Sequence, residues 1–310
     1  MILLPRFLDI PTGRQNSFGD QRSYFKTFLL LGAFAVFNLS YSSSAGNVTR
    51  DIEFAKVGDL SLKLDLHLPD KQTAPLIVYV HGGAWRGGTR DSIPFAALLK
   101  DGFAIASVDY RLSTQALFPA QVHDIKAAIR FLRSKQTQLG IDSRRIVIAG
   151  SSAGGHLAAL AGVTNRHKEL EGSVGDCPDQ SSDVQGIVSF YGGSNLTSIL
   201  NQSTEPGVKM RLPALQLLLG GPPAEKADLA RLASPVFHID ANDPPLLLIH
   251  GDADPQMPPE QSRELAAAYE KAKLPVKLVM IPGAVHGGPQ FYDEERLGLV
   301  KDFISRNVTK

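Results

Sequence analysis

The sequence RIVIAGSSAGGH, residues 145–156, decides how the rest of the chain is interpreted. A run of β-branched and apolar residues leads into a segment rich in Ala and Leu, which predicts a strand followed directly by a helix. Gly150 and Gly154 stand two positions before and after Ser152, so the turn between the two elements can be sharp. A turn of this kind exposes the serine hydroxyl at the end of the strand, and Ser152 is therefore a candidate nucleophile.

A serine hydroxyl needs two further side chains to react at neutral pH. An imidazole must accept its proton, and a carboxylate must orient that imidazole. Of the eight histidines, His286 lies on a glycine-rich turn after the last predicted strand, in VMIPGAVHGG. Asp252 and Asp254 follow the preceding strand. We prefer Asp254 as the orienting acid because Pro255 stiffens the next position, whereas Asp252 is suited to capping the turn.

A second glycine-rich stretch, HGGAWRGG at residues 81–88, follows the predicted strand PLIVYVH. Acyl transfer places negative charge on the substrate carbonyl oxygen, and backbone N–H groups stabilise it where the chain approaches closely. We expect Gly82 and Gly83 to supply such groups together with Ala153, the residue after the nucleophile. The candidates for the substrate pocket are Trp85, which is expected in the acyl pocket or beneath the loop, and Tyr191.

The other histidines are expected to have structural or surface positions. His81 and His250 end predicted strands beside glycine and are expected to brace loops by hydrogen bonds, and His156 is expected to be structural. His67, His123, His167 and His238 are interpreted as surface or helix residues.

Strands and helices alternate through most of the remaining chain. Gly58 and Asp59 are predicted to form the turn of an antiparallel hairpin, with leucines alternating with polar residues after it. Later apolar runs, short and closed by turn signals, are typical of central parallel strands. Helices are expected over residues 92–100, 119–138, 154–163, 259–272 and 291–307. This order predicts an α/β fold with a mostly parallel, doubly wound sheet that an N-terminal antiparallel hairpin opens.

Residues 46–310 are predicted to form one catalytic domain. Within it, residues 194–244 break the alternation, because the segment is too long for a simple crossover between strands. We interpret this segment as a small cap over one end of the sheet. An ordinary crossover with a long loop is the alternative.

Residues 1–45 have the pattern of an export signal. Arg14, Arg22 and Lys26 precede an apolar run over residues 28–39 that is too short to span a bilayer. Small residues before position 46 suit a signal peptidase, and we expect cleavage after Ala45. The protein is then exported, periplasmic or extracellular, without stable membrane insertion. The alternative is an uncleaved membrane anchor.

The composition excludes several classes of function. The chain has 310 residues, with 32 basic and 31 acidic groups, so a nucleic-acid partner is not expected. Cys177 is the only cysteine, which excludes an intrachain disulfide, and its polar loop makes it a poor candidate for a catalytic thiol. No metal or cofactor is expected.

Taken together, these motifs resemble those of the α/β-hydrolase esterases. Within them, the chain is similar to the bacterial esterase/lipase group that includes the bifunctional acetylxylan/feruloyl esterase-like proteins and borders the hormone-sensitive-lipase family. The likeness covers residues 50–306 and rests on HGGAWRGG, DYRLS, GIDSRRIVIAGSSAGGHLAAL, FYGG, LLGGPP, DPPLLLIHGDADPQMP and PGAVHGG. The resemblance implies the α/β-hydrolase fold and a metal-free serine carboxylester hydrolase. It assigns the nucleophile, acid, base and oxyanion-hole amides to Ser152, Asp254, His286 and the group Gly82, Gly83 and Ala153.

The substrate is less defined than the chemistry. The expected partner is a small-molecule or polysaccharide-linked ester, with short acyl or aryl groups such as acetyl or feruloyl. One alternative is an amide hydrolase of the arylformamidase type, which shares the fold and the catalytic residues. The other is a non-catalytic binding protein on a hydrolase scaffold. Such proteins usually lose a member of the triad, and this chain retains all three.

Overall fold

The structure is a computed structural model that describes residues 47–70 and 73–308. All the described residues belong to one compact unit. The predicted export signal, residues 1–45, lies outside the described residues. In the part of the chain that is described, no helix has the length and apolar character needed to cross a membrane.

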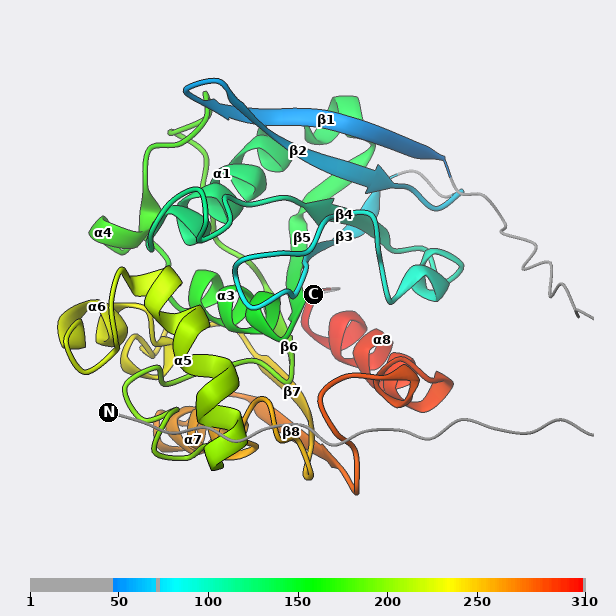
Figure 1. Ribbon diagram of the computed structural model, residues 1–310. Coiled ribbons are helices and arrows are strands. Elements are labelled where there is room, and N and C mark those ends of the chain that lie inside the picture. Colours follow the sequence, from blue (N-terminus) through cyan, green and yellow to red (C-terminus); the bar gives the residue numbers. More distant parts are fainter. Residues whose placement is uncertain (1–46, 71–72, 309–310) are drawn as a thin grey trace, which may run out of the picture. The chain divides into compact units, whose positions relative to one another are not determined.

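The described residues form an eight-stranded sheet in the spatial order β1-β2-β4-β3-β5-β6-β7-β8 (Figure 1). Strands β1 and β2 form an antiparallel hairpin, β2 pairs antiparallel with β4, and all neighbours from β4 to β8 are parallel. The predicted α/β fold with an N-terminal antiparallel hairpin is confirmed. The strands are β1 (Val48–Val57), β2 (Leu60–His67), β3 (Ala74–Val80), β4 (Ala104–Val108), β5 (Ile141–Ser151), β6 (Gly186–Phe190), β7 (Leu246–Gly251) and β8 (Val276–Ile281).

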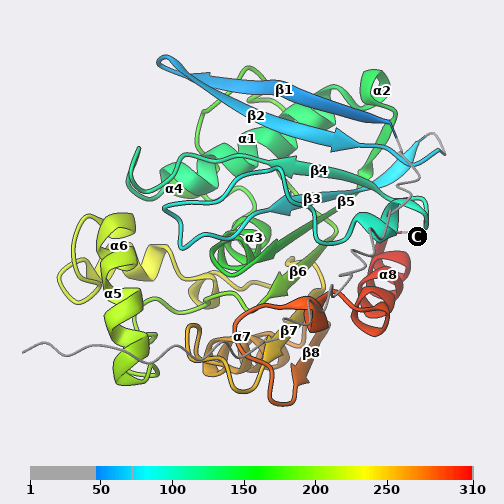
Figure 2. The same ribbon diagram turned by 45° about the vertical axis from the view of Figure 1, so that its right-hand side comes forward.

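Helices cover both faces of the sheet (Figure 2). Side chains of successive residues in a strand point to opposite faces, and in β3 Leu76 and Val78 join one core whereas Ile77 and Tyr79 join the other. Residues of α1, α3 and α7 pack into the first core, and residues of α8 pack into the second. The helices outside the segment between β6 and β7 are α1 (Ala120–Ser134), α2 (Gln136–Leu139), α3 (Ala153–Gly162), α4 (Lys168–Glu171), α7 (Glu260–Lys271) and α8 (Glu294–Val308).

One predicted helix is wrong. Residues 92–100 form turns and a single 3₁₀ turn, η1 (Ala96–Leu99), rather than an α-helix. Phe95 and Leu98 are both fully buried in the second core, so one turn is enough to bury the apolar side chains that suggested a helix. Pro94 has no N–H group and disfavours a helical conformation in the residue before it. A helix is therefore not favoured to begin before Pro94.

The segment between β6 and β7 forms a helical insertion. It contains α5 (Glu205–Leu219), α6 (Ala227–Leu232) and the 3₁₀ turn η2 (Pro235–Phe237), and α5 and α6 lie side by side in both views (Figure 1, Figure 2). The Thr204 hydroxyl accepts a hydrogen bond from the Gly207 N–H at 3.3 Å and caps α5. Gly220, with φ of 73°, ends the same helix.

Gly154 allows α3 to pack closely against β3. A Cβ atom at this position would lie 2.0 Å from the Val80 carbonyl oxygen, so Gly154→Ala forces the helix away from the strand. We expect this substitution to lower the free energy of unfolding by about 3 kcal/mol. Gly298→Ala in α8 is the matched control, because nothing lies within 4 Å of its added Cβ, and it should raise stability by about 0.5–1 kcal/mol. Urea denaturation measures both changes, and a wild-type midpoint for Gly154→Ala would contradict the packing described here.

Candidate active site

The turn between β5 and α3 holds Ser152 in a strained backbone conformation. Its φ is 55° and its ψ is −120°, a region that residues other than glycine rarely adopt. The Ser152 N–H donates to the Phe190 carbonyl at 2.9 Å, and its own carbonyl accepts from the His156 N–H at 3.0 Å. A Cβ atom at Gly150 would lie 2.2 Å from the Gly154 carbonyl oxygen. Both flanking glycines are therefore required for the sharp turn that was predicted around Ser152.

Two hydrogen bonds join Ser152, His286 and Asp254, which come from three separate loops. The Ser152 Oγ lies 2.8 Å from the His286 Nε2, and the His286 Nδ1 lies 2.6 Å from the Asp254 Oδ2. A carboxylate can only accept a hydrogen bond, so Nδ1 carries the proton and Nε2 is free to accept one from the serine hydroxyl. The structure thus brings the three residues together in the order that proton transfer from the serine requires.

Asp254 is held as a carboxylate. It is 6% exposed, and its Oδ1 accepts from the N–H groups of Gln256 and Met257, both at 2.8 Å. Burial alone would raise its pKa, but hydrogen bonds from His250, His286 and the Met257 backbone hold the pKa well below its ordinary value. A permanent negative charge behind His286 fixes the orientation of the imidazole and stabilises it when it is protonated.

Asp252, the alternative acid, has a different position. It is exposed, and its Oδ1 accepts from the Gly283 N–H at 2.6 Å, which joins the turns that follow β7 and β8. The structure therefore places it as a turn cap, as the sequence suggested.

His250 contacts the triad from behind, a role that the sequence interpretation did not include. Its Nδ1 lies 2.6 Å from the Ser262 hydroxyl, and its Nε2 lies 3.0 Å from the Met257 carbonyl and 3.3 Å from the Asp254 Oδ2. Because a carbonyl only accepts, Nε2 carries the proton and shares it between the two oxygens. The sequence analysis expected His250 only to brace a loop, because it ends a strand beside glycine, and the contact with Asp254 was not predicted.

The glycine-rich loop after β3 lies beside the nucleophile. A Cβ atom at Gly82 would lie 2.9 Å from the Ser151 carbonyl and 3.4 Å from the Ser152 Cβ, so its backbone adjoins the catalytic serine. Ala153 is the first residue of α3, where backbone N–H groups have no partner inside the helix. Gly83 turns the loop with φ of 118°, and its carbonyl accepts from the N–H groups of Arg86 at 3.1 Å and Gly87 at 3.0 Å. These are the backbone groups that were predicted to face a developing oxyanion.

Trp85, a candidate for the substrate pocket, is buried next to the nucleophile candidate. It is 2% exposed and contributes to the lining of the cavity beside Ser152. Its Nε1 donates to the His156 Nδ1 at 3.0 Å, and the His156 Nε2 donates to the Ala233 carbonyl at 2.7 Å. One buried histidine therefore connects the glycine-rich loop, helix α3 and the insertion.

His156 makes the fold sensitive to acid. Burial lowers its pKa to about 4, against the opposing effect of the hydrogen bond to Ala233, whereas an unfolded histidine titrates near 6.5. Its stabilising contribution is therefore complete above pH 6.5 and is lost as the pH falls toward 4, on the order of 3 kcal/mol. We expect His156→Gln to show a smaller loss of stability than wild type between pH 7 and pH 4.5 in urea denaturation. Equal losses in both proteins would contradict this role.

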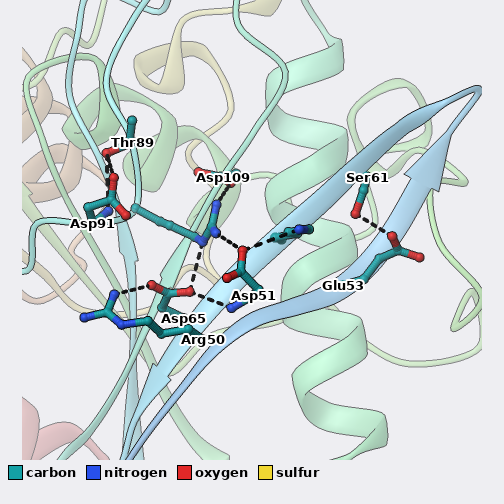
Figure 3. Close-up of polar contacts among 10 residues, drawn as sticks. Arg50, Asp51, Glu53, Ser61, Asp65, Thr89, Asp91 and Asp109 are labelled. Atoms are coloured by element: carbon teal, nitrogen blue, oxygen red, sulfur yellow. Dashed lines mark hydrogen bonds and ion pairs between the residues drawn. The ribbon is translucent and has the colours of Figure 1, made fainter.

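Arg90 joins the end of the glycine-rich loop to the β1–β2 hairpin. It donates hydrogen bonds to Asp65 and Asp109 and pairs with Asp51, and Arg50 adds a further bond to Asp65 at 2.9 Å (Figure 3). Burial opposes ionisation of Asp65, but hydrogen bonds from the Asp51 N–H and Arg90, with the charges of Arg90 and Arg50, hold its pKa below its ordinary value. The network ties the loop to the edge of the sheet.

A cavity of about 60 Å³ lies beside the Ser152 hydroxyl. The insertion supplies part of its wall through α5, which sequence patterns did not identify because its path depends on tertiary packing. The lining residues are Ala84, Trp85, Ser152, Ala153, Met210, Arg211, Ala214, Gln256, Met257 and His286. Among the described residues, no group of three or more His, Cys, Asp or Glu side chains is arranged to hold a metal ion.

Tyr191, the other candidate for the substrate pocket, is not among the residues that line this cavity. Its backbone has φ of 41° directly after β6, which turns the side chain into the second core. There its ring packs edge-on against His286, with centroids 4.8 Å apart, and its hydroxyl pairs with that of Tyr292 at 2.8 Å. Tyr191 therefore packs directly against the imidazole of His286.

A family model described as BD-FAE matches residues 64–269. The chain belongs to the BD-FAE family. The matched region of the BD-FAE model includes Ser152 and Asp254 and ends before His286. Esterase LipC of Mycobacterium tuberculosis is 31% identical over 218 residues, which are 69% of this chain and 53% of that protein. The chain spans about half the length of the curated relatives it matches.

Solved structures extend the similarity of this BD-FAE family member to the whole described fold. A truncated carbohydrate esterase from gut microbiota superimposes with a TM-score of 0.78 and 33% identity, covering 87% of this chain and 99% of that one. Esterase 2 of Thermogutta terrifontis, in a form phosphorylated by paraoxon, superimposes with a TM-score of 0.67 and 27% identity. That match covers 85% of this chain and 94% of the Thermogutta chain. The fold and the family are those of the α/β-hydrolase esterases.

Proposed function

We propose that the protein is a serine carboxylesterase that hydrolyses short-chain acyl or aryl esters through an acyl-enzyme intermediate. The observation that carries the proposal is the pair of hydrogen bonds linking Ser152, His286 and Asp254 at 2.8 Å and 2.6 Å. Membership of the BD-FAE family and the similarity to esterases of known structure support it.

In the first half of the reaction, the Ser152 Oγ attacks the ester carbonyl carbon while the His286 Nε2 takes the hydroxyl proton. The carbonyl oxygen becomes negatively charged and accepts hydrogen bonds from backbone N–H groups of the glycine-rich loop and Ala153. Collapse of this intermediate breaks the bond to the alcohol oxygen, which leaves with the proton that His286 carries. The acyl group remains on Ser152.

In the second half, a water molecule attacks the acyl-enzyme carbonyl and His286 accepts its proton. The second tetrahedral intermediate uses the same backbone donors. When it collapses, the bond between the acyl carbon and the Ser152 Oγ breaks, His286 returns its proton to that oxygen, and the carboxylic acid is released. Asp254 remains ionised throughout, because its lowered pKa keeps it a carboxylate.

The size of the cavity supports a preference for small acyl groups. A volume of about 60 Å³ between α5 and the nucleophile leaves little space for a long chain. We expect turnover of p-nitrophenyl esters to fall steeply beyond butyrate. Comparable rates for acetate and octanoate esters would contradict this substrate class.

Labelling by a fluorophosphonate probe tests the proposed nucleophile directly. Such a probe should label the purified wild-type protein and leave Ser152→Ala unlabelled. Absence of labelling in wild type, together with absence of esterase activity, would support a binding protein instead. Faster hydrolysis of N-formylkynurenine than of any ester in the screen would favour the arylformamidase alternative.

Polysaccharide-linked esters are the natural substrates that we propose. The support is the similarity to a carbohydrate esterase from gut microbiota and the expected export signal of residues 1–45. Release of acetate from acetylated xylan, or of ferulate from methyl ferulate, tests the acyl group. Export is tested by N-terminal sequencing of protein recovered outside the cytoplasm, which should begin at Gly46.

A further inference from the structure

The cavity beside Ser152 has an unbalanced charge in its wall. Arg211 of α5 contributes a guanidinium to the lining, and none of the lining residues is an Asp or a Glu. Arg211 is only 6% exposed, although arginine is rarely buried without an acidic partner. Its position in the catalytic cavity therefore requires an explanation.

The protein itself satisfies few of the hydrogen bonds that Arg211 can donate. Its Nε donates to the Ser203 hydroxyl at 3.3 Å, and its Nη1 lies 3.5 Å from the Met257 sulfur, a weak acceptor. Its Nη2 is buried and has no hydrogen-bond partner among the residues of 47–70 and 73–308. A guanidinium has five N–H donors, so most of its capacity is unused within the described structure.

Asp254 attracts Arg211 through space but forms no ion pair with it. Both of its oxygens already accept hydrogen bonds, Oδ1 from Gln256 and Met257 and Oδ2 from His286. No ion pair joins Arg211 to any acidic side chain in the described part of the chain. Burial lowers the pKa of Arg211 to about 10, against the attraction of Asp254, and the group still carries its charge at neutral pH.

We propose that Arg211 binds a carboxylate carried by the ester substrate, so that the preferred substrates are anionic esters. This inference rests on the proposed esterase function. A carboxylate offers two oxygens in one plane, which match the N–H groups on the two Nη atoms of a guanidinium. It also supplies the negative charge that the lining lacks. Arg211 thus selects the substrate, and Ser152 in the same cavity cleaves it.

The carboxylate could belong to the acyl part or to the alcohol part of the ester, and two substrate sets distinguish these sources. For the acyl part, monoethyl malonate, succinate and glutarate are compared with ethyl 3-methylbutanoate, 4-methylpentanoate and 5-methylhexanoate, which have the same shape without the charge. For the alcohol part, 4-acetoxybenzoate is compared with 4-acetoxybenzamide. The measured quantity is the ratio of kcat/KM for each anionic ester to that of its neutral partner.

Three variants of the full chain test whether Arg211 is responsible for a preference for anionic esters. Arg211→Met removes the charge and keeps an apolar stem, whereas Arg211→Lys keeps the charge without the planar fork. Lys209→Met is the matched control, because Lys209 is on the same helix but is 74% exposed and pairs with Glu205. In at least one substrate set, the ratio should be about 10- to 100-fold higher in wild type than in Arg211→Met, mainly through KM. Arg211→Lys should restore part of it, and Lys209→Met should match wild type.

Stability separates substrate binding from a structural role. Since the buried charge of Arg211 has no acidic partner, Arg211→Met should keep or raise the Tm of the free protein. A large fall in Tm with an unchanged substrate ratio would assign Arg211 to the fold and overturn the proposal. The same ratio in wild type and Arg211→Met, in both substrate sets, would also overturn it.

Failure of the proposed function has a different signature. A wild-type protein that hydrolyses no ester and resists fluorophosphonate labelling is not an esterase, whatever Arg211 does. In that case, titration calorimetry with succinate still tests the anion site: binding by wild type and Lys209→Met but not by Arg211→Met would support it. No difference in succinate binding among the three proteins would reject it.

Discussion

Ser152→Ala is expected to lower kcat for p-nitrophenyl acetate by roughly 10⁴- to 10⁶-fold. Alanine removes the only atom that can form the acyl-enzyme, and His286 then has no hydroxyl to activate at its Nε2. The remaining backbone donors and the cavity can still accelerate direct attack by water, so a small residual rate should persist. Steady-state kinetics, combined with circular dichroism to verify the fold, measures the effect.

The neighbouring serine provides the matched control for this substitution. Ser151 is buried, and its hydroxyl pairs with that of Tyr79 at 2.9 Å rather than with an imidazole. Ser151→Ala should cost about 1 kcal/mol of stability and keep fluorophosphonate labelling. Wild-type kcat in Ser152→Ala, or loss of labelling in Ser151→Ala alone, would show that the nucleophile is not Ser152.

Asp254→Asn should have the second-largest effect, a fall in kcat of about 10⁴-fold with little change in structure. The amide can donate a hydrogen bond to the His286 Nδ1, which places the proton of the imidazole on Nε2. In that tautomer the imidazole cannot accept the proton of Ser152. The substitution also removes the negative charge that stabilises the protonated imidazole.

Asp252→Asn distinguishes the two candidate acids. The side-chain oxygen of asparagine can still accept the hydrogen bond from the Gly283 N–H, so the turn is preserved. We expect kcat within about threefold of wild type, in keeping with the small effects of surface substitutions. A larger loss of kcat in Asp252→Asn than in Asp254→Asn would reverse the assignment.

Local sequence patterns were sufficient for most of the fold and for naming the candidate nucleophile, acid and base that the structure brings together. Strands such as β5 are apolar runs with clear turn signals. The glycines on either side of Ser152 are needed because a side chain at either position would clash with neighbouring backbone. The order of Ser152, Asp254 and His286 along the chain then limited the choice of partners. These features depend on neighbouring residues, which is why a single sequence reveals them.

Tertiary packing determined what the sequence did not reveal. Tyr191 packs into the second core with a positive φ that no local pattern required. Arg211 was not identified because the direction of α5 depends on how the insertion packs. Residues 92–100 shared the apolar spacing of a helix, but burial of Phe95 and Leu98 needed only one turn. In each case long-range contacts, rather than local preference, decided the position.

The network around Arg90 has a consequence for the energetics of the reaction. The glycine-rich loop is fixed at one end by β3 and at the other by Asp65 and Asp109, and Trp85 is held between them by His156. Its amides are therefore preorganised before an ester arrives, so their dipoles need not reorient as charge develops on the carbonyl oxygen. The work of aligning these dipoles is done during folding, and the barrier of each turnover is correspondingly lower.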